Sequence, residues 1–365
     1  MKKNILYLII VVFIYLSLLY INKPEVFTFK FDFTLVKKYF LSQDITHEVP
    51  GKRLFLSDGE IHNAAGYLYT KGYDPSLFNF QHPPLIKYLF GYSIRLFNNP
   101  YYVQILFSIF LLILTYLIGI KTFNKPEVSL LSCLLISIDP LFLDISSHSY
   151  LDLGQTVFLL LYFYLMMFFR KRYVIQGIAL GLLISSKFWA GSLFFMFLIG
   201  LYLIYVKKFN IKNYLIHLFI GLFVFSLTYI RTFINQDGLF NIVFFQLKIL
   251  KYWFNHSVTS LFGSSFMLFI TGFFKSWWGE KLVIKSDLWS FSWPLIFFVS
   301  IWNLYEIIKS KKIITKTFIG VILFLYLCYL SIQAPFARYF ILVLPFGYLT
   351  LSDFIFKFAR KINTK

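Results

Sequence analysis

One stretch of the chain, SDGEIHNAAGYLYTKGYDPSLFNFQHPPLIKYLF at residues 57–90, concentrates side chains that can move protons or bind anions. A carboxylate can take the proton of a hydroxyl group, a histidine can transfer or share a proton, and a lysine can stabilise a negative charge. The candidates in this stretch are Asp58, Glu60, His62, His82 and Lys87.

Each candidate also has a purely structural interpretation. Asp58 and Glu60 could be solvated charges on a polar loop, and His62 and His82 could only hydrogen-bond that loop. The functional interpretation of the two carboxylates gains weight because a histidine and an HPPL block follow them. The double proline of HPPL is structural under either interpretation.

Further ionisable residues lie in or beside apolar segments, where a charge is costly and often functional. Asp139, His148 and Asp152 lie in SIDPLFLDISSHSYLDLGQTVF, Lys187 lies in GIALGLLISSKFWAG, and Arg338 and Tyr339 lie in FARYFILVLPF. Lys187 could instead only mark the end of its helix at the membrane interface. Arg338 is the best phosphate partner among the cations, because a guanidinium can bind two oxygens at once.

These residues must be positioned by a membrane protein. Of the 365 residues, 59% are hydrophobic, and the mean hydropathy is +0.71. Soluble domains contain roughly 45–50% apolar residues. Apolar runs long enough to cross a hydrocarbon core of about 30 Å recur along the whole chain. We therefore expect one integral membrane domain, residues 1–365, with an all-α polytopic fold.

The apolar runs predict about ten transmembrane helices. They lie at 5–21, 101–120, 128–143, 153–169, 173–187, 188–206, 213–230, 291–308, 317–333 and 339–356. With the N-terminus inside, alternate threading places the Lys and Arg clusters on the cytoplasmic side at every turn. This predicts a multi-pass cell-membrane protein whose chemistry is extracytoplasmic. We predict that residues 259–274 are interfacial or re-entrant, although they could form a short span that would upset the alternation.

The topology predicts two extracytoplasmic regions. The first, residues 22–100, contains FTFKFDFTL, whose alternation predicts a strand-like segment, and PPLIKYLFGYSIRLF, which predicts a juxtamembrane helix. The second, residues 231–290, is rich in aromatic residues. Four tryptophans in or just after this region are predicted to be interfacial anchors. They are Trp277, Trp278, Trp289 and Trp293.

The charge and the cysteines exclude other classes of protein. The net charge of +19 does not indicate a nucleic-acid partner, because the basic residues lie in short clusters that membrane topology explains. Cys133 and Cys328 both lie in apolar runs, so the sequence supports neither a disulfide framework nor a cysteine metal site.

The motifs together resemble the protein O-mannosyltransferase family. DGEIHNAAGYLYTKGY followed by HPPLIK is similar to the first outer loop of that family, with an acidic residue, a histidine and an HPPLxK block in the same order. The three later blocks quoted above follow in family order, so the resemblance covers most of residues 55–350. The related aminoarabinose transferases are also similar.

The resemblance implies a C-type membrane glycosyltransferase architecture and a polyprenyl- or dolichyl-phosphate-linked sugar as the donor. The implied catalytic carboxylate is Asp58 or Glu60, with Asp152 as the second acidic residue. The residues implied in donor or substrate binding are His62, His82, Lys87, Asp139, His148, Lys187, Arg338 and Tyr339.

The chain also departs from the family pattern. The family usually has two adjacent acids, whereas Gly59 separates Asp58 from Glu60, so either could be the equivalent carboxylate. His148 stands where an arginine is common. The soluble beta-rich insert of eukaryotic members is absent, which favours a prokaryotic or archaeal relative.

We expect an inverting transfer of a monosaccharide to a protein, lipid or glycan hydroxyl, with mannose and a Ser or Thr acceptor favoured by the resemblance. Membrane lipids are the other expected partners. A divalent cation could serve at the phosphate, but no ligand motif of convincing spacing is present.

The sequence argues against three other functions. A transporter or flippase of lipid-linked sugars would also need charges in the membrane, but it would more often show inverted repeats. An oligosaccharyltransferase would share the architecture, but SWWGE at residues 276–280 lacks the aspartate of that family's WWDYG. A non-enzymatic scaffold would leave the outward bias of acids and histidines unexplained.

Overall fold

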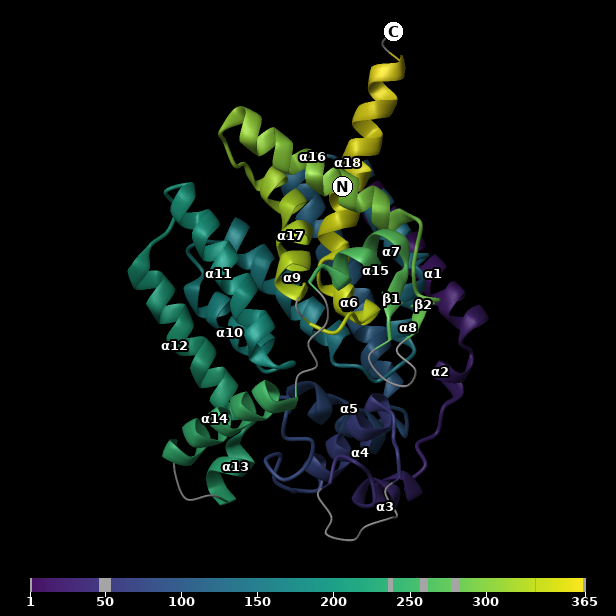
Figure 1. The fold of residues 1–365 in the computed structure, drawn as a ribbon, viewed down its shortest axis with the longest axis vertical. Helices are drawn as coiled ribbons and strands as arrows, with labels where there is room; N and C mark the ends of the chain where they lie inside the picture. Colours follow the sequence, from purple (N-terminus) through teal and green to yellow (C-terminus); the bar gives the residue numbers. More distant parts are fainter. Residues whose placement is uncertain are drawn as a thin grey trace.

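The structure is a computed structural model that describes residues 2–45, 54–235, 239–256, 262–276, 282–331 and 333–363. Figure 1 shows a bundle of long helices and, at one end of it, a smaller layer of short helices. We call this smaller layer the outer layer. Trp277 and Trp278, and with them most of the SWWGE segment, lie outside the described residues.

The bundle is built from the helices in the upper part of Figure 1, most of which are long. They are α1 (Lys2–Asn22), α6 (Tyr101–Phe123), α7 (Pro126–Ser137), α8 (Pro140–Ser146), α9 (Asp152–Phe168), α10 (Tyr173–Ile184), α11 (Trp189–Tyr205), α12 (Ile211–Thr228), α16 (Ser292–Ser310), α17 (Thr315–Leu330) and α18 (Leu344–Asn363), with the 3₁₀ helix η1 (Ala337–Leu342) before α18. Each predicted span coincides with one of these helices, or with a consecutive pair of them at 128–143 and 339–356.

Length and composition show which helices could cross a membrane. Among the described residues, Asn4–Asn22, Tyr101–Phe123 and Ile211–Thr228 are both long and apolar enough. Helices α7 and α8 pass the same test as a pair bent by 66°, while α9, α10, α11 and α17 are apolar but shorter. The polytopic all-α architecture agrees with the sequence, whereas the number of about ten spans is not established.

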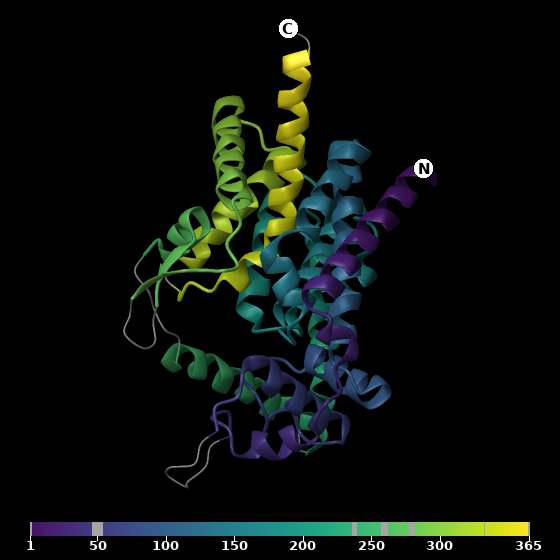
Figure 2. The same cartoon turned by 90° about the vertical axis from the view of Figure 1, so that its right-hand side faces the viewer.

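The first outer region forms most of the outer layer (Figure 2). Its helices are α2 (Glu25–Thr28), α3 (Thr34–Phe40), α4 (Asp58–Thr70) and α5 (Leu85–Phe97). Helix α5 is the helix predicted from PPLIKYLFGYSIRLF. The strand-like prediction for FTFKFDFTL is wrong, because its residues form the end of α2, a short link and the start of α3. The aromatic ring of Phe31 packs on Tyr67 and Phe33 instead of belonging to a strand.

Helices α4 and α5 are in direct backbone contact. A Cβ atom on Gly66 would collide with the Lys87 carbonyl, and one on Gly91 would collide with the Gly66 carbonyl. Only glycine permits this approach. Because α5 leads through a short turn into α6, the contact holds α4 firmly against the end of the bundle.

The second outer region forms three helices and a hairpin. The helices are α13 (Ile230–Asn235), α14 (Leu239–His256) and α15 (Ser264–Thr271), and the antiparallel hairpin consists of β1 (Phe273–Lys275) and β2 (Val283–Lys285). Helix α15 has eight residues, or about 12 Å at 1.5 Å per residue, and is too short to cross a membrane. The anchor prediction for Trp293 is wrong, because its side chain is fully buried between helices of the bundle.

Candidate functional site

The first turn of α4 presents two carboxylates in different ways. Ser57, the N-cap residue, accepts a hydrogen bond from Glu60 N at 3.4 Å. In return, the Ser57 amide and hydroxyl donate to Glu60 Oε2 at 2.8 and 2.7 Å. This reciprocal capping box turns the Glu60 carboxylate back onto the helix end. Asp58 takes no part in these bonds, and its carboxylate is available to other elements.

Asp58 contacts the C-terminal part of the chain. Arg338 Nη1, in η1, donates to Asp58 Oδ2 at 2.7 Å. Burial raises the pKa of the Asp58 carboxyl, but the charge and hydrogen bond of Arg338 and the charge of Lys187 outweigh it, so the pKa lies below its ordinary value. The Asp58 side chain is about half exposed (51%), so an ionised carboxylate is accessible beside a guanidinium.

A second ion pair lies near the first. Lys187, in the link between α10 and α11, lies 2.5 Å from Asp152 Oδ1 at the start of α9. The ammonium group of Lys187 also lies 4.4 Å from the centre of the Tyr339 ring. Because Tyr339 follows Arg338 in η1, both ion pairs contact this one 3₁₀ helix. Asp152 is almost completely buried, with 3% of its side chain exposed.

Tyr150, which the sequence analysis did not single out, joins this site to His148. The Arg338 guanidinium lies 5.0 Å from the centre of the Tyr150 ring. The His148 ring stacks on the same ring at 5.1 Å, and His148 Nδ1 donates to the Asp144 carbonyl at 2.8 Å. In the sequence, only its position between His148 and Asp152 indicates that Tyr150 could belong to the site.

The two histidines of the first outer loop, His62 and His82, lie next to each other. His62 Nδ1 donates to the Ser149 carbonyl at 2.8 Å, and its ring lies 6.3 Å from that of His82. Burial lowers the pKa of His62 to about 4, and it lowers the pKa of His82 well below its ordinary value. Both rings are therefore neutral at pH 7. Trp253 of α14 covers His82, with 5.2 Å between the ring centres.

Lys87 does not reach the ion pairs. Its Nζ donates to Asn79 O at 2.6 Å, to Asn79 Oδ1 at 3.0 Å and to His82 O at 2.8 Å. These three bonds use all three donors of the ammonium group. Burial lowers the pKa of the fully buried Lys87 to about 7. The residue holds the turn at residues 79–82, and this arrangement does not support the predicted phosphate contact.

Asp139 likewise lies apart from the site. Its carboxylate caps α8 through the amides of Leu141 and Phe142, and it accepts further bonds from Trp293 Nε1 at 3.0 Å and Tyr348 OH at 2.5 Å. With 1% of the residue exposed, it ties α8 to α16 and α18. The structure gives Asp139 a role in packing and does not support the predicted substrate contact.

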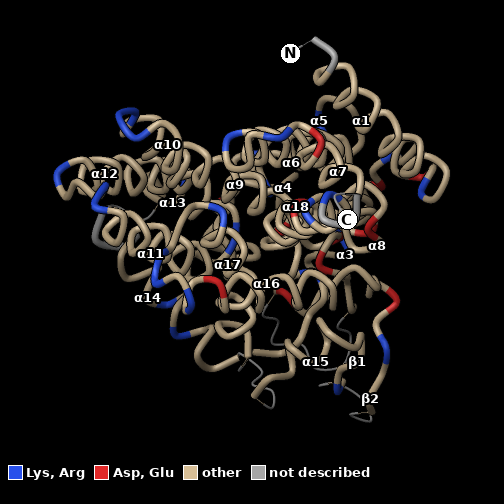
Figure 3. The backbone as a smooth tube through the Cα atoms, turned by 90° about the horizontal axis from the view of Figure 1, so that it is seen from above, with Lys and Arg blue, Asp and Glu red and all other residues tan. Residues whose placement is uncertain are grey.

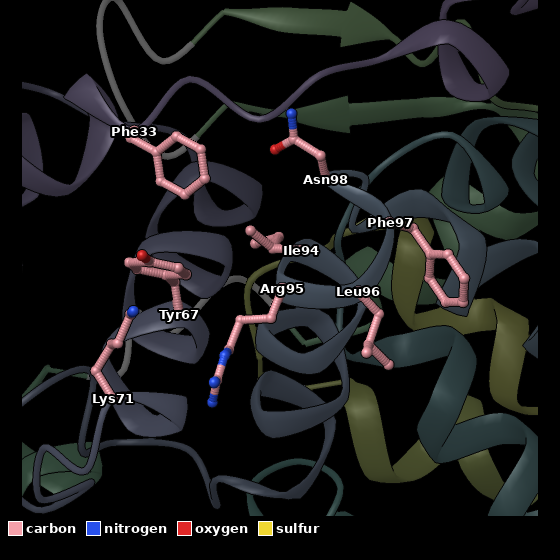
Figure 4. Close-up of a pocket in the computed structure, with 8 residues that line it drawn as sticks. All are labelled: Phe33, Tyr67, Lys71, Ile94, Arg95, Leu96, Phe97 and Asn98. Atoms are coloured by element: carbon pink, nitrogen blue, oxygen red, sulfur yellow. The ribbon is translucent and has the colours of Figure 1, made fainter.

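A surface pocket of about 500 Å³ lies at the other end of α4 and is shown in Figure 4. Its lining includes Tyr67, Lys71 and Arg95 and none of the predicted site residues. Among the described residues, no three His, Cys, Asp or Glu side chains are grouped to hold a metal ion.

The two ion pairs define what the site can do. Asp58 offers an ionised, accessible carboxylate that can accept a proton. Arg338 and Lys187 offer donors beyond those used in their ion pairs, and Arg338 Nε has no partner within the described residues. An anionic group placed between the two cations would therefore lie close to a base.

The chain is similar to known proteins in part of its sequence and in its fold. Residues 81–230 match the sequence family described as dolichyl-phosphate-mannose-protein mannosyltransferase. The match includes Asp152 and Lys187 but neither Asp58 nor Arg338. No curated protein sequence matches the chain.

The fold is similar to two crystal structures of ArnT from Cupriavidus metallidurans. The structure bound to undecaprenyl phosphate has a TM-score of 0.63 and 13% identity, covering 88% of this chain and 58% of that chain. The apo structure has a TM-score of 0.59 and 14% identity, covering 88% and 57%. The present chain thus spans less than two thirds of the length of that protein.

These comparisons confirm the predicted resemblance to O-mannosyltransferases and aminoarabinose transferases. They also confirm the predicted all-α fold, which this chain shares with the two ArnT structures. At such low identity, the structural likeness establishes the fold and leaves the reaction to be judged from the site.

Proposed function

We propose that this protein is a membrane glycosyltransferase that transfers a monosaccharide from a polyprenyl-phosphate-linked donor to a hydroxyl group. The observation that carries the proposal is the pairing of two carboxylates with two cations, Asp58 with Arg338 and Asp152 with Lys187, around one 3₁₀ helix. The family match over residues 81–230 and the fold of a protein crystallised with undecaprenyl phosphate support the same donor class.

The reaction requires one bond to form and one to break. The acceptor oxygen attacks the anomeric carbon of the sugar, and the bond from that carbon to the phosphate oxygen breaks with both electrons leaving on the phosphate. The acceptor proton passes to Asp58. Arg338 and Lys187 stabilise the charge that develops on the departing polyprenyl phosphate. Attack opposite the leaving group inverts the configuration at the anomeric carbon.

Asp152 acts in this scheme through Lys187. Its buried carboxylate holds the ammonium group in place and balances its charge when no donor is bound. Tyr339 supports the same ammonium through its ring face. His62 positions the proposed base, Asp58, because the bond from His62 to the Ser149 carbonyl fixes the first turn of α4 against the segment before α9.

We propose mannose as the sugar and a Ser or Thr hydroxyl of a protein as the acceptor, on the support of the family match. We also propose that the site faces the extracytoplasmic side. The support for this side is the set of Lys and Arg clusters in the links between bundle helices at the ends away from α4 and α5, at residues 121–125, 170–172, 207–212 and 309–316.

The test is a donor-consumption assay. Purified protein in nanodiscs is incubated with radiolabelled polyprenyl-phosphate mannose and a mixture of hydroxyl acceptors, and the lipid products are separated. Release of polyprenyl phosphate with transfer of label to an acceptor is the expected result. Asp58→Asn serves as the control with the same size and fold.

Two outcomes would contradict the proposal. If the donor stays chemically intact but moves between leaflets, the protein is a transporter of lipid-linked sugars. If the donor stays intact and does not move, the ion pairs serve only the structure.

A further inference from the structure

A second pocket, of about 160 Å³, lies at the opposite end of the bundle from Asp58. It is lined by residues near the ends of α9, α10, α11 and α12, among them Met166 and Leu203. From Asp152 to Met166, α9 rises by about 21 Å at 1.5 Å per residue, so this pocket is well separated from the two ion pairs.

The lining of the pocket is strongly basic. Arg170, Lys171 and Lys208 contribute three positive charges, and no Asp or Glu lines it. The amides of Asn210 and Asn213 add polar groups at the start of α12, where Asn210 Oδ1 accepts from Asn213 N at 3.1 Å. Figure 3, viewed from this end of the bundle, shows the Lys and Arg residues beside α10 and α12. These features are suited to an anion.

The helix ends around the two pockets differ. The small pocket lies at the last turns of α9 and α11 and the first turns of α10 and α12, so the opposing helix dipoles largely cancel and the three cations determine the field. The pocket of Figure 4 lies at the C-terminal ends of α4 and α5, whose dipoles repel anions. Arg95 there donates to the Thr70 carbonyl at the end of α4. The small pocket is therefore the better anion site.

Apolar side chains flank the basic pocket. Val174 and Ile178 of α10 are 50% and 41% exposed, and Ile211 and Leu215 of α12 are 60% and 56% exposed. Helix α12 is also one of the helices long and apolar enough to cross a membrane. A ligand with a charged head and hydrocarbon tails would cover both surfaces at once.

We propose that this pocket binds the phosphate of an anionic phospholipid, with the acyl chains along the exposed faces of α10 and α12. An anionic phospholipid and free inorganic phosphate carry the same charged group, a phosphate. The flanking apolar surface favours the lipid. This site is independent of the sugar-transfer site.

Native mass spectrometry of the protein released from detergent tests the proposal. The probes are phosphatidylglycerol, phosphatidylcholine and inorganic phosphate. The protein should retain one phosphatidylglycerol in preference to phosphatidylcholine, and millimolar inorganic phosphate should not displace it. Arg170→Gln combined with Lys208→Gln should weaken phosphatidylglycerol binding roughly ten- to thirty-fold.

The control variant combines Lys71→Gln with Lys285→Gln, which removes the same number of charges from exposed positions elsewhere. It should bind phosphatidylglycerol like the parent protein. If the double variant in the pocket does not fold, Lys171→Gln alone should lower the affinity about fivefold.

Three results would overturn the proposal. The first is equal binding of both lipids by the parent protein. The second is binding of phosphatidylglycerol by the pocket variant as tightly as by the control variant. The third is displacement of the lipid by inorganic phosphate. The last result would assign the pocket to a soluble anion.

Discussion

Arg338 donates a hydrogen bond to the Asp58 carboxylate at 2.7 Å, although 280 positions separate the two residues in the chain. The contact places the proposed base beside the proposed phosphate-binding cation. A bound donor phosphate would compete with Asp58 for the guanidinium. Donor binding would then loosen the ion pair and make the carboxylate a stronger base for the acceptor proton.

Asp58→Asn should lower turnover by about 10²–10⁴-fold, the usual effect of losing a general base, and should leave donor binding nearly unchanged. Glu60→Gln should keep most of the activity, because a glutamine can still complete the capping box. Turnover and donor binding measured side by side for both variants decide the roles. Equal turnover of Asp58→Asn and the parent would move the base elsewhere, with Asp152 the next candidate.

Arg338→Lys should weaken donor binding about ten- to a hundredfold, because a lysine keeps the charge but loses the second donor of the fork. The affinity is measured by titrating a non-hydrolysable polyprenyl-phosphate sugar. Lys71→Gln, in the pocket of Figure 4, is the matched control and should bind like the parent. If Arg338→Lys binds the donor as tightly as the parent protein does, the proposed bidentate contact between Arg338 and the phosphate is wrong.

Stability should fall as the pH falls from about 6.5 to 4. The pKa of His62 is 6.5 when unfolded and about 4 when buried, so in this range the unfolded state binds a proton that the folded state does not. The loss by pH 4 should be about 3 kcal/mol. Thermal unfolding across this range measures it, and His62→Gln should remove this part of the dependence, while the part due to His82, whose pKa burial also lowers, should remain. An equally steep dependence in His62→Gln would assign the effect to other groups.

The side of the membrane can be found by labelling an engineered cysteine. Leu77 is 65% exposed in the outer layer, whereas its neighbour Ser76 is buried, so Leu77→Cys is the better position. The background needs Cys328→Ser, because Cys328 is exposed while Cys133 is buried. An impermeant reagent should label Leu77→Cys in intact cells. Labelling only after permeabilisation would reverse the proposed orientation.

The sequence predicted the helical bundle well, because the length of an apolar run directly reflects the thickness it must cross. The order of the predicted spans also placed Asp58, Asp152, Lys187 and Arg338 near one boundary of the membrane. The structure brings these four together. The choice between Asp58 and Glu60 stayed open because capping-box geometry depends on the rotamer of Glu60, which the sequence does not contain.

The predictions that the structure does not support share a physical cause. Lys87, Asp139 and Trp293 are polar or amphipathic groups whose partners come from distant or irregular parts of the chain. A sequence shows the cost of burying such a group but not the group that satisfies it. The phenylalanines of FTFKFDFTL gave a wrong strand prediction because they pack on helices. Phe31 and Phe33 contact Tyr67 of α4, whereas Phe27 and Phe29 contact α1 and α6.

The link between Asp58 and Arg338 has a consequence for biosynthesis. The ribosome must add almost the whole chain after Asp58 before Arg338 exists, and both segments must then reach the same side of the membrane. A nascent chain that has inserted only its early helices therefore carries an incomplete site. The proposed sugar transfer would begin only after the last helices have docked.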